Sequence, residues 1–460
     1  MCLLENNSRH ASDPCIRKGH EVSSSETNDR LPELPRDVLL LILSSFTTKE
    51  VKRTSLISKK WNTWLLGFYP KINFEPSKTI KDTWYEIRNN DDELAKKRTK
   101  FVTWVDQVLK QHVDSSIDEF RVVFDLDNSW QSHVDKWVSF ALTKQVKTLD
   151  FNFQPVYDRL DTLLNRCGLT IDHCTPLPGF NHSLTTLRLR DVNITSEAVE
   201  SILLSCPFLE NLNIIYSELL TSIKCRASLV SLKHFDVSCC FKLKKIDISA
   251  PKMVCFRYRG KPVELNIRNA VSLSSVYIAA GPGEDILYAF DHPAMYLPQL
   301  EALSLGIPVA DFASELTVGV KLLKFPVLTT LKVLDISIRG CHLSSFLSWT
   351  PLIEACPALE KLTFKVDYCY DCGIDWKILD RRDGSPLVSL KTFEILSYAG
   401  RRIDIELAGF IFENAINLQE VIVQVASDPP YKREKPLPPA RISILKDMVP
   451  PGVAFILMEP

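Results

Sequence analysis

The sequence has almost no net charge and no long apolar run. Its 55 lysines and arginines balance 56 aspartates and glutamates, for a formal net charge of -1. This balance gives no electrostatic reason to expect nucleic acid or a membrane surface as the main partner. A membrane-spanning helix needs about 18 or more consecutive apolar residues, and no stretch reaches that length. The polar first residues also lack the apolar core of a signal peptide, so we expect the protein in the nucleus, the cytoplasm or both.

Motifs of catalysis and cofactor binding are absent as well. The chain contains no G-x-G-x-x-G, Walker loop, H-E-x-x-H or G-x-S-x-G, the signatures of dinucleotide, phosphate, zinc-protease and hydrolase sites. The most glycine-dense loop, Gly281 to Asp285, lacks the following Lys-Ser/Thr of a phosphate site and is interpreted as a turn. We therefore expect no enzymatic activity, no catalytic residue and no cofactor.

The cysteines do not form a disulfide or metal framework. There are 13 of them, spread over the whole chain without dense regular spacing. Cys369-Tyr370-Asp371-Cys372 is the only C-x-x-C, and neither Cys341 nor Cys356 lies in the second pair that a zinc site requires. In a reducing compartment such cysteines behave as small buried hydrophobes, so we predict no metal site.

The first structured unit begins near residue 29 with a short amphipathic helix. Pro35 suits a first helical position because its fixed φ and missing donor fit there. The apolar residues that follow have the spacing of one helical face: Leu39, Ile42, Leu43 and Phe46. Residues 38–43 are all apolar, so the helix has more apolar surface than so short a unit buries in itself. Such a surface is typical of a partner-binding site.

Two further helices are predicted directly after it. Thr47 to Glu50 has the Thr-x-x-Glu form of a capping box, which starts a second helix. Ser58 caps a third helix, in which Trp61, Trp64 and Leu65 lie on one side.

The order of these residue types resembles the F-box. The matching residues are Leu31-x-x-Leu34-Pro35, Ile42-Leu43-Ser44, Lys49-Glu50, Arg53 to Leu56, Ser58-Lys59 and Trp61. They cover residues 29–66 without gaps. Two positions depart from the family pattern: Thr47 stands where proline is frequent, and Lys52 where an apolar residue is usual. The capping box compensates for the first departure, and the second is where packing or partner contact would weaken.

From Phe101 onward the pattern alternates between helix and strand and predicts an α/β repeat array. One phrase, Leu-x-x-Leu-x-Leu or a near relative, recurs throughout. Its copies begin at Leu184, Leu209, Leu232, Leu243, Met253, Leu273, Leu300, Leu328, Leu359, Leu390 and Leu418. This is the leucine-rich-repeat pattern, in which each unit buries its apolar strand only by stacking on its neighbours.

Spacing separates two kinds of repeat. The second apolar anchors Leu331 and Leu362 are far enough apart in the sequence for a helix on the outer face. The steps from Phe235 to Ile246 and from Ile246 to Phe256 are much shorter and leave no room for a helix at every turn. We therefore expect the middle of the array to be rich in strands.

A duplicated motif supports the register. Residues 206–212 and 356–362 share Cys-Pro-x-Leu-Glu-x-Leu, each after a helix-like segment. The proline ends that helix and turns the chain into the next strand. In this repeated setting Cys206 and Cys356 are interpreted as core residues rather than nucleophiles.

The combination resembles the plant F-box/leucine-rich-repeat proteins, of the F-box/FBD/LRR type. The expected fold class is α/β, with a short all-α F-box of three helices followed by an irregular leucine-rich-repeat solenoid. The expected domains are a disordered tail (1–28), the F-box (29–70), a charged linker (71–100), the leucine-rich-repeat domain (101–386), FBD-like terminal repeats (387–427) and a Pro-rich tail (428–460). The basic cluster Lys96 to Lys100 in the linker is either a nuclear import signal or the solvated start of a helix.

The resemblance implies a non-catalytic substrate receptor of an SCF-type cullin-RING ubiquitin ligase. In such a complex the F-box docks on a Skp-family adaptor, the adaptor joins the cullin, and the repeats hold a protein substrate for ubiquitination. By position, the resemblance assigns adaptor contact to Leu34, Pro35, Val38, Leu39, Ile42, Leu43, Leu56, Ser58 and Trp61. Some of these residues hold the three helices together instead, and Trp61 fits either role. Two alternatives stay open: a repeat scaffold without ligase function, and a ligand-dependent co-receptor.

Overall fold

The fold was analysed in a computed structural model of the chain. The structure describes residues 70–76, 91–112, 116–154, 168–171, 183–281, 299–308, 325–339, 347–367, 384–400, 402–425 and 439–458. The nine residues assigned to adaptor contact lie outside the described residues, as do the three predicted helices, Thr47 and Lys52. Their placement therefore stays a prediction.

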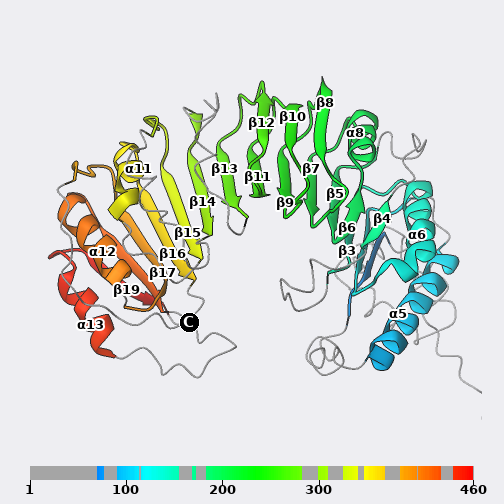
Figure 1. Cartoon of the computed structure of the whole chain (residues 1–460), viewed down its shortest axis with the longest axis horizontal. Coiled ribbons are helices and arrows are strands. Elements are labelled where there is room, and N and C mark those ends of the chain that lie inside the picture. The colour runs from blue at the N-terminus through cyan, green and yellow to red at the C-terminus, as the bar shows by residue number, and fades with distance from the viewer. Residues whose placement is uncertain are drawn as a thin grey trace, which may run out of the picture.

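The described residues form an arch whose inner side is one continuous parallel sheet of 14 strands (Figure 1). The strand order is β1-β2-β3-β5-β7-β9-β11-β13-β14-β15-β16-β17-β18-β19. The bounds are β1 Lys71–Phe74, β2 Glu119–Val123, β3 Thr148–Asn152, β5 Thr186–Arg190, β7 Asn211–Ile215, β9 His234–Ser238, β11 Cys255–Gly260, β13 Ser275–Ala280, β14 Ala302–Pro308, β15 Val333–Arg339, β16 Lys361–Asp367, β17 Thr392–Tyr398, β18 Glu420–Val425 and β19 Ala454–Met458. Because the sheet follows chain order, the chain advances by one coil per inner strand.

The outer side of the arch carries helices at both ends and strands in the middle (Figure 1). The helices are α5 Asp91–Gln111, α6 Gln131–Thr143, α8 Ser196–Ser205, α11 Thr350–Glu354, α12 Arg402–Asn414 and α13 Pro439–Met448, with short 3-10 turns η2 Asn128–Trp130 and η4 Leu347–Trp349. Strands β8 Ser222–Ser228, β10 Lys245–Ser249 and β12 Glu264–Arg268 form a second parallel sheet, and β4 Leu169–Ile171 pairs with β6 Val192–Ile194. Residues 206–281, all described, contain strands and turns but no helix. The expectation of a strand-rich middle is confirmed.

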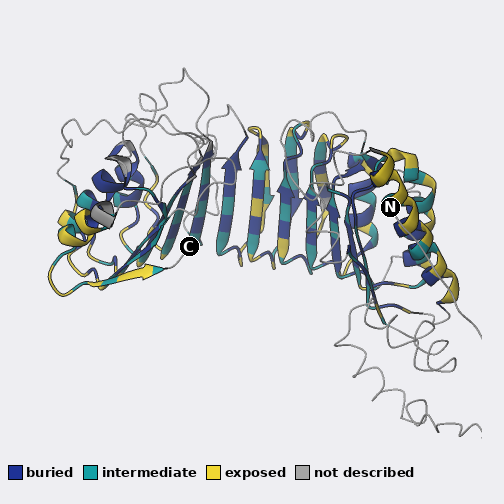
Figure 2. Ribbon diagram, turned by 90° about the horizontal axis from the view of Figure 1, so that it is seen from below, coloured by how far each residue is buried: buried dark blue, intermediate teal, exposed yellow. Residues whose placement is uncertain are grey.

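Two rows of apolar side chains run across the inner sheet from β1 to β18 and form the core. The first row is Ile72, Phe120, Leu149, Leu187, Leu212, Phe235, Phe256, Val276, Leu303, Leu334, Leu362, Phe393 and Val421, and the second is Phe74, Val122, Phe151, Leu189, Ile214, Val237, Tyr258, Ile278, Leu305, Ile336, Phe364, Ile395 and Val423. No member is more than 3% exposed. Along most of these strands the buried residues alternate with more exposed ones (Figure 2), in the two-residue period of a strand; the exceptions are Asp150 and Thr363, which are buried polar residues between the two rows.

The register at β15 corrects the predicted one. The phrase was expected to begin at Leu328, which makes Leu331 and Val333 the strand's core residues. In the structure Leu334 pairs with Leu303 and Leu362, so the phrase begins at Leu331 instead. Leucines at three-residue steps produce two overlapping phrases, and only the pairing of neighbouring strands decides between them.

The copy of the phrase that begins at Leu243 differs in position from the other copies. Its apolar residues Ile246 and Ile248 lie on β10, in the outer three-stranded sheet rather than in the inner one. The two short steps therefore cross from Phe235 on the inner sheet to Ile246 on the outer sheet and back to Phe256. Together they make one full coil, which runs from Phe235 to Phe256. The coils before and after it, from Leu212 to Phe235 and from Phe256 to Val276, are similarly short.

The segments expected to be a charged linker and a Pro-rich tail both contribute elements of the solenoid. Phe74 on β1 packs edge-on against Trp104 of α5, with ring centroids 4.9 Å apart. Arg98, within the basic cluster, lies on α5 and pairs with Asp125 and Asp127 at 2.8 and 2.5 Å. At the other end α13 precedes β19, which pairs with β18. The helical interpretation of Lys96 to Lys100 is confirmed by α5, and a last strand near the end of the chain was expected. Strand β1 and helix α13 were not predicted, because short apolar pairs in charged or proline-rich surroundings give too weak a periodicity.

The corrected register predicts different costs for two adjacent substitutions. Leu334→Ala removes a fully buried side chain from the core row and is expected to lower the free energy of unfolding by about 2–5 kcal/mol. Val333→Ala changes a partly exposed residue of the other face and is expected to cost about 1 kcal/mol or less. Urea denaturation followed by circular dichroism measures both. A larger loss for Val333→Ala would contradict the register.

Candidate functional site: the inner face of the sheet

The residues between the two core rows project from the inner side of the sheet. This central row is Asn73, Arg121, Asp150, Arg188, Asn213, Asp236, Arg257, Tyr277, Ser304, Asp335, Thr363, Glu394, Ile422 and Ile456. Each is the variable position between the second and third apolar residues of the repeated phrase. The phrase could have identified them, but only after the strand register was known, and none was predicted as a site residue.

At the N-terminal end of the row, charges of opposite sign alternate on neighbouring strands. Arg121 on β2 pairs with Glu75 and, through its Nε atom, with Asp150 Oδ2 on β3 at 3.2 Å. Burial raises the pKa of the Asp150 carboxyl, although Arg121, Arg188 and Arg190 act to lower it. The two arginines of β5 therefore face a single carboxylate that is already engaged by Arg121.

In the middle of the row, Asp236 on β9 holds a network together. Its Oδ2 atom accepts a hydrogen bond from Asn213 Nδ2 at 2.9 Å, and its Oδ1 atom accepts one from Ser238 Oγ at 2.8 Å. Arg257 Nε lies 3.9 Å from Oδ2. The Arg257 guanidinium carbon also lies over the Tyr277 ring, 4.8 Å from its centroid, a favourable cation–π geometry.

The C-terminal part of the row continues this pairing between neighbouring strands. Ser304 Oγ donates to Asp335 Oδ2 at 2.9 Å, and Thr363 Oγ1 donates to Glu394 Oε2 at 3.2 Å. Lys361 Nζ lies 2.8 Å from the same Glu394 oxygen. The inner face is thus a polar surface whose side chains are held in place by one another before any partner binds, an arrangement that lowers the entropy cost of binding.

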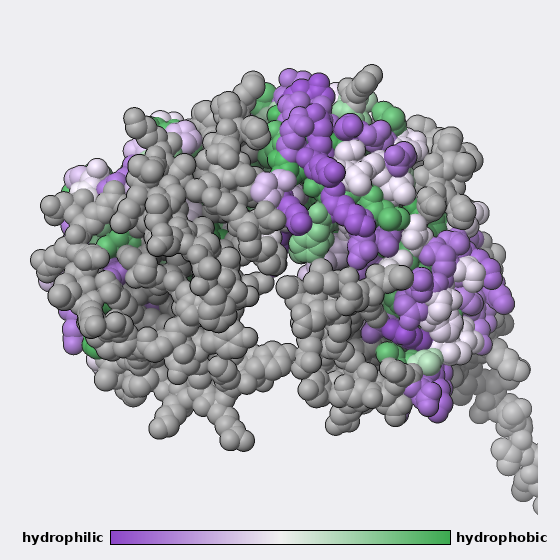
Figure 3. Space-filling model, viewed as in Figure 1, coloured by the Kyte–Doolittle hydropathy of each residue, from purple (hydrophilic) through white to green (hydrophobic). Residues whose placement is uncertain are grey.

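The outer sheet is polar in a different way. Lys245 pairs with Glu264 at 2.5 Å, and Arg268 pairs with Asp247 at 3.0 Å, both between adjacent outer strands. Figure 3 shows hydrophilic residues gathered over the middle of the arch, where these strands lie. These exposed pairs keep the outer face solvated and contribute little to stability.

The two cysteines of the duplicated motif are core residues, as predicted. Cys206 and Cys356 are 3% and 2% exposed, and Cys356 Sγ donates to the Leu352 carbonyl. Burial raises the pKa of the Cys356 thiol to about 12 and that of Cys240 to about 12. Such thiols carry almost no thiolate at neutral pH and are inert as nucleophiles.

Two further findings concern only the described part of the chain. There, no three His, Cys, Asp or Glu side chains gather closely enough to hold a metal ion. No helix in these ranges is both long and apolar enough to cross a membrane. Cys369 and Cys372 lie outside the described residues.

A solenoid with one inner parallel strand per coil and a variable outer layer is the architecture of a leucine-rich-repeat protein. Comparison with known proteins agrees. Residues 108–438 match the family described as "At1g61320/AtMIF1, LRR domain", and residues 31–73 match the F-box domain. The first match covers more than half of the chain, so the chain belongs to this leucine-rich-repeat family and carries an F-box before the repeats.

Similar proteins in Arabidopsis thaliana have the same combination in their names. The chain is 26% identical to "F-box protein At3g59000" over 451 residues, which covers 89% of each chain. It is 28% identical to "F-box/LRR-repeat protein At3g58900" over 267 residues, or 53% of this chain and 78% of that protein. The predicted resemblance to plant F-box/leucine-rich-repeat proteins is confirmed.

Asp150 is expected to make stability depend on pH in a defined direction. Its pKa is raised in the folded state, so the ionised carboxylate destabilises the fold, and this penalty disappears as the pH falls through the folded pKa towards the unfolded one. Asp150→Asn removes the titration. We compare the melting temperature of the variant with that of the unchanged protein at each pH. The difference, variant minus unchanged protein, is expected to be more positive at pH 7 than at pH 4. The opposite trend would contradict the assignment.

Buried thiols are expected to resist alkylation. Iodoacetamide at pH 8 should leave Cys240 and Cys356 unmodified in the native protein and modify both in guanidinium chloride, because only unfolding restores the ordinary thiol pKa. Mass spectrometry of the digested protein reports each cysteine separately. Rapid native modification of Cys356 would reopen the nucleophile interpretation.

Proposed function

We propose that this protein is the substrate-recognition subunit of an SCF-type cullin-RING ubiquitin ligase. One observation carries the proposal: a single chain joins an F-box segment to a leucine-rich-repeat solenoid. F-box domains generally bind Skp-family adaptors, and a solenoid offers an extended inner face for a client protein. The two parts together connect a shared ligase core to a particular substrate.

In this proposal the chain contributes position rather than bond chemistry. The F-box docks on the adaptor, the adaptor links to the cullin-RING core, and the inner face holds the substrate near the ubiquitin-conjugating enzyme. Tethering makes transfer to a substrate lysine effectively intramolecular and so raises the local concentration of that lysine. The complex would act in the nucleus, the cytoplasm or both.

The proposed adaptor contact is the apolar surface of the first helix together with residues of the two that follow. It comprises Leu34, Pro35, Val38, Leu39, Ile42, Leu43, Leu56, Ser58 and Trp61. Apolar anchors such as these dominate binding energy when they fill pockets of a partner. We also propose that residues 387–427 form the FBD-like end of the repeats.

Lys52 favours one alternative, a repeat scaffold whose F-box binds the adaptor weakly. A lysine at a usually apolar position removes contact area and adds a charge that must stay solvated. Under this alternative the inner face would still bind its client, but the client would not be ubiquitinated.

Adaptor binding is the decisive test. We expect the full chain to co-purify with a Skp-family adaptor. The double substitution Leu34→Ala/Pro35→Ala is expected to abolish co-purification, because it removes the apolar side chains at the start of the first predicted helix. Arg268→Gln, on the outer sheet of the solenoid, is a matched control that should retain the adaptor.

A Lys52→Leu variant separates the two functions. Stronger adaptor retention by this variant than by the unchanged chain would support the weak-binding scaffold. Failure of the unchanged chain to retain any adaptor would overturn the ligase proposal.

A further inference from the structure

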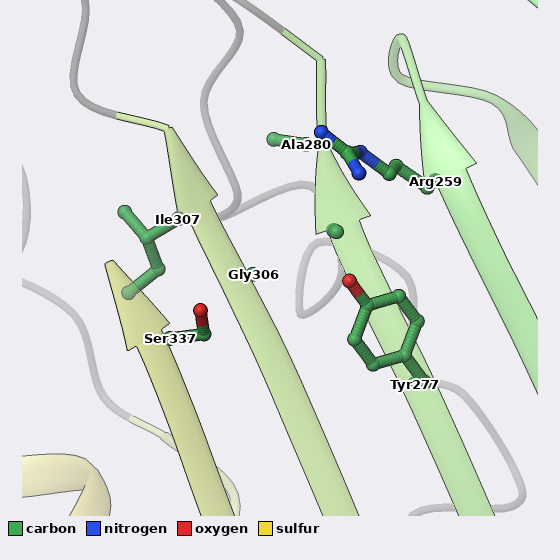
Figure 4. Close-up of a pocket in the computed structure, with 7 residues that line it drawn as sticks. Arg259, Tyr277, Ala280, Gly306, Ile307 and Ser337 are labelled. Carbon is green, nitrogen blue, oxygen red and sulfur yellow. The ribbon is translucent and has the colours of Figure 1, made fainter. Parts of the chain in front are cut away.

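The inner face is hollowed where β11, β13, β14 and β15 lie side by side (Figure 4). The hollow has a volume of about 50 Å³ and is lined by Arg259, Tyr277, Ala279, Gly306 and Ser337, among others. Four of these residues occupy one row of the sheet, because Arg259 pairs with Ala279, Ala279 with Gly306, and Gly306 with Ser337. The hollow is therefore built into the register of the sheet.

Two small residues form its floor. A Cβ atom at Gly306 would lie 2.5 Å from Ala279 Cβ and 3.3 Å from the Tyr277 hydroxyl oxygen. No real side chain tolerates the first distance, so the close approach of β13 and β14 requires glycine at this position. The absence of side chains here leaves space between the larger residues on either side.

Three polar groups surround that space. Figure 4 shows Arg259 reaching from β11 across the end of β13, the Tyr277 hydroxyl below it, and Ser337 on the far side of Gly306. The Tyr277 ring is held by the Arg257 guanidinium, which lies over its face. One permanent cation and two hydroxyl donors thus converge on the hollow.

The charge of Arg259 is not balanced by the described part of the chain. Several other cations of the inner face are engaged: Arg257 on the same strand lies near Asp236, and Lys361 on β16 pairs with Glu394. Arg259 has no ion pair and no side-chain hydrogen bond with any residue in the described ranges. The carboxylate of Asp236 already serves Arg257, Asn213 and Ser238.

The size of the hollow limits what it accepts. Pockets for small molecules have volumes of about 300–1,000 Å³, several times the volume found here. A single polar group attached to a larger partner fits better than a free small molecule. Arginine with hydroxyl donors is a favourable set for a carboxylate or phosphate group.

We propose that this hollow is the subsite that receives an anionic side chain, a carboxylate or a phosphate, of the protein client. Arg259 makes the charged contact, and the Tyr277 and Ser337 hydroxyls donate hydrogen bonds. The inference rests on the proposed function, in which the inner face binds the client, and it names the chemistry that the client must present.

Degenerate peptide libraries test the proposal directly. The immobilised full chain is offered pools that differ only in a fixed central residue: Glu, phosphoserine, Gln, Ser or Lys. We expect the Glu or phosphoserine pool to be retained about fivefold or more over its neutral counterpart, as a charge-assisted hydrogen bond provides. The better of the two anionic pools identifies the group as carboxylate or phosphate.

Variants of the hollow show whether the preference arises there. Arg259→Gln is expected to reduce the ratio of anionic to neutral retention to about one, and Arg259→Glu to favour the Lys pool. Tyr277→Phe keeps the ring and removes only the hydroxyl, so it should weaken anionic retention about twofold to threefold. The matched control Arg268→Gln, on the outer sheet, should keep the full preference.

Two results would overturn the proposal. One is equal retention of anionic and neutral pools by the unchanged chain, and the other is an undiminished anionic preference in Arg259→Gln. Melting temperatures establish that each variant is folded. Adaptor co-purification, measured on the same preparations, reports the ligase function separately, so a failure of that function is distinguishable from a failure of the subsite.

Discussion

Each coil from β1 to β18 buries two apolar side chains against the coils next to it, and the rest of the described structure depends on this packing. A single strand with its connection has too little interior to stabilise itself, so stability comes from the stacking of neighbours. The pair Leu187 and Leu189, for example, has equivalents on the strands to either side. This constraint fixes the strand register, and the register in turn fixes which residues face the inside of the arch. The packing residues therefore determine which residues are available to bind a partner.

The outer layer adjusts to the amount of chain between inner strands. Where coils are short, as between Leu212 and Val276, the outer layer is a second sheet. The coil from Leu334 to Leu362 is longer and contains α11. A helix with its side chains is about 10 Å wide, about twice the spacing of strands. Helices thus lengthen the outer circumference at the ends of the arch, whereas outer strands match the inner spacing in the middle.

The sequence predicted most of the core but not the candidate site. The repeated phrase located the inner strands from β5 to β18, with β15 in the wrong register, because leucines at fixed spacing have one physical cause. It started the phrase of β15 at Leu328, three residues too early, and it did not distinguish the phrase at Leu243, on the outer sheet, from the phrases of the inner sheet. A period of two residues does not say which strand lies alongside. Residues such as Arg259 and Gly306 occupy variable positions, and their meeting in space depends on that pairing. Pairwise contact between coils is the information that a local pattern lacks.

The inner face combines rigidity with selectivity because most of its charges are paired with one another. Paired groups such as Lys361 and Glu394 present a neutral, ordered surface that gains little from a charged partner. Recognition then depends on the charged side chains that have no ion pair among the described residues, such as Arg259. A wrong partner binds weakly because it removes water from these side chains without pairing with them. Since the variable rows make no contribution to the core, substitutions such as those at Arg259 or Ser337 could change the preferred client while the solenoid stays intact. Gly306 is the exception, because a side chain at this position would clash with Ala279 and separate β13 from β14. A substitution there would change both the hollow and the packing of the two strands.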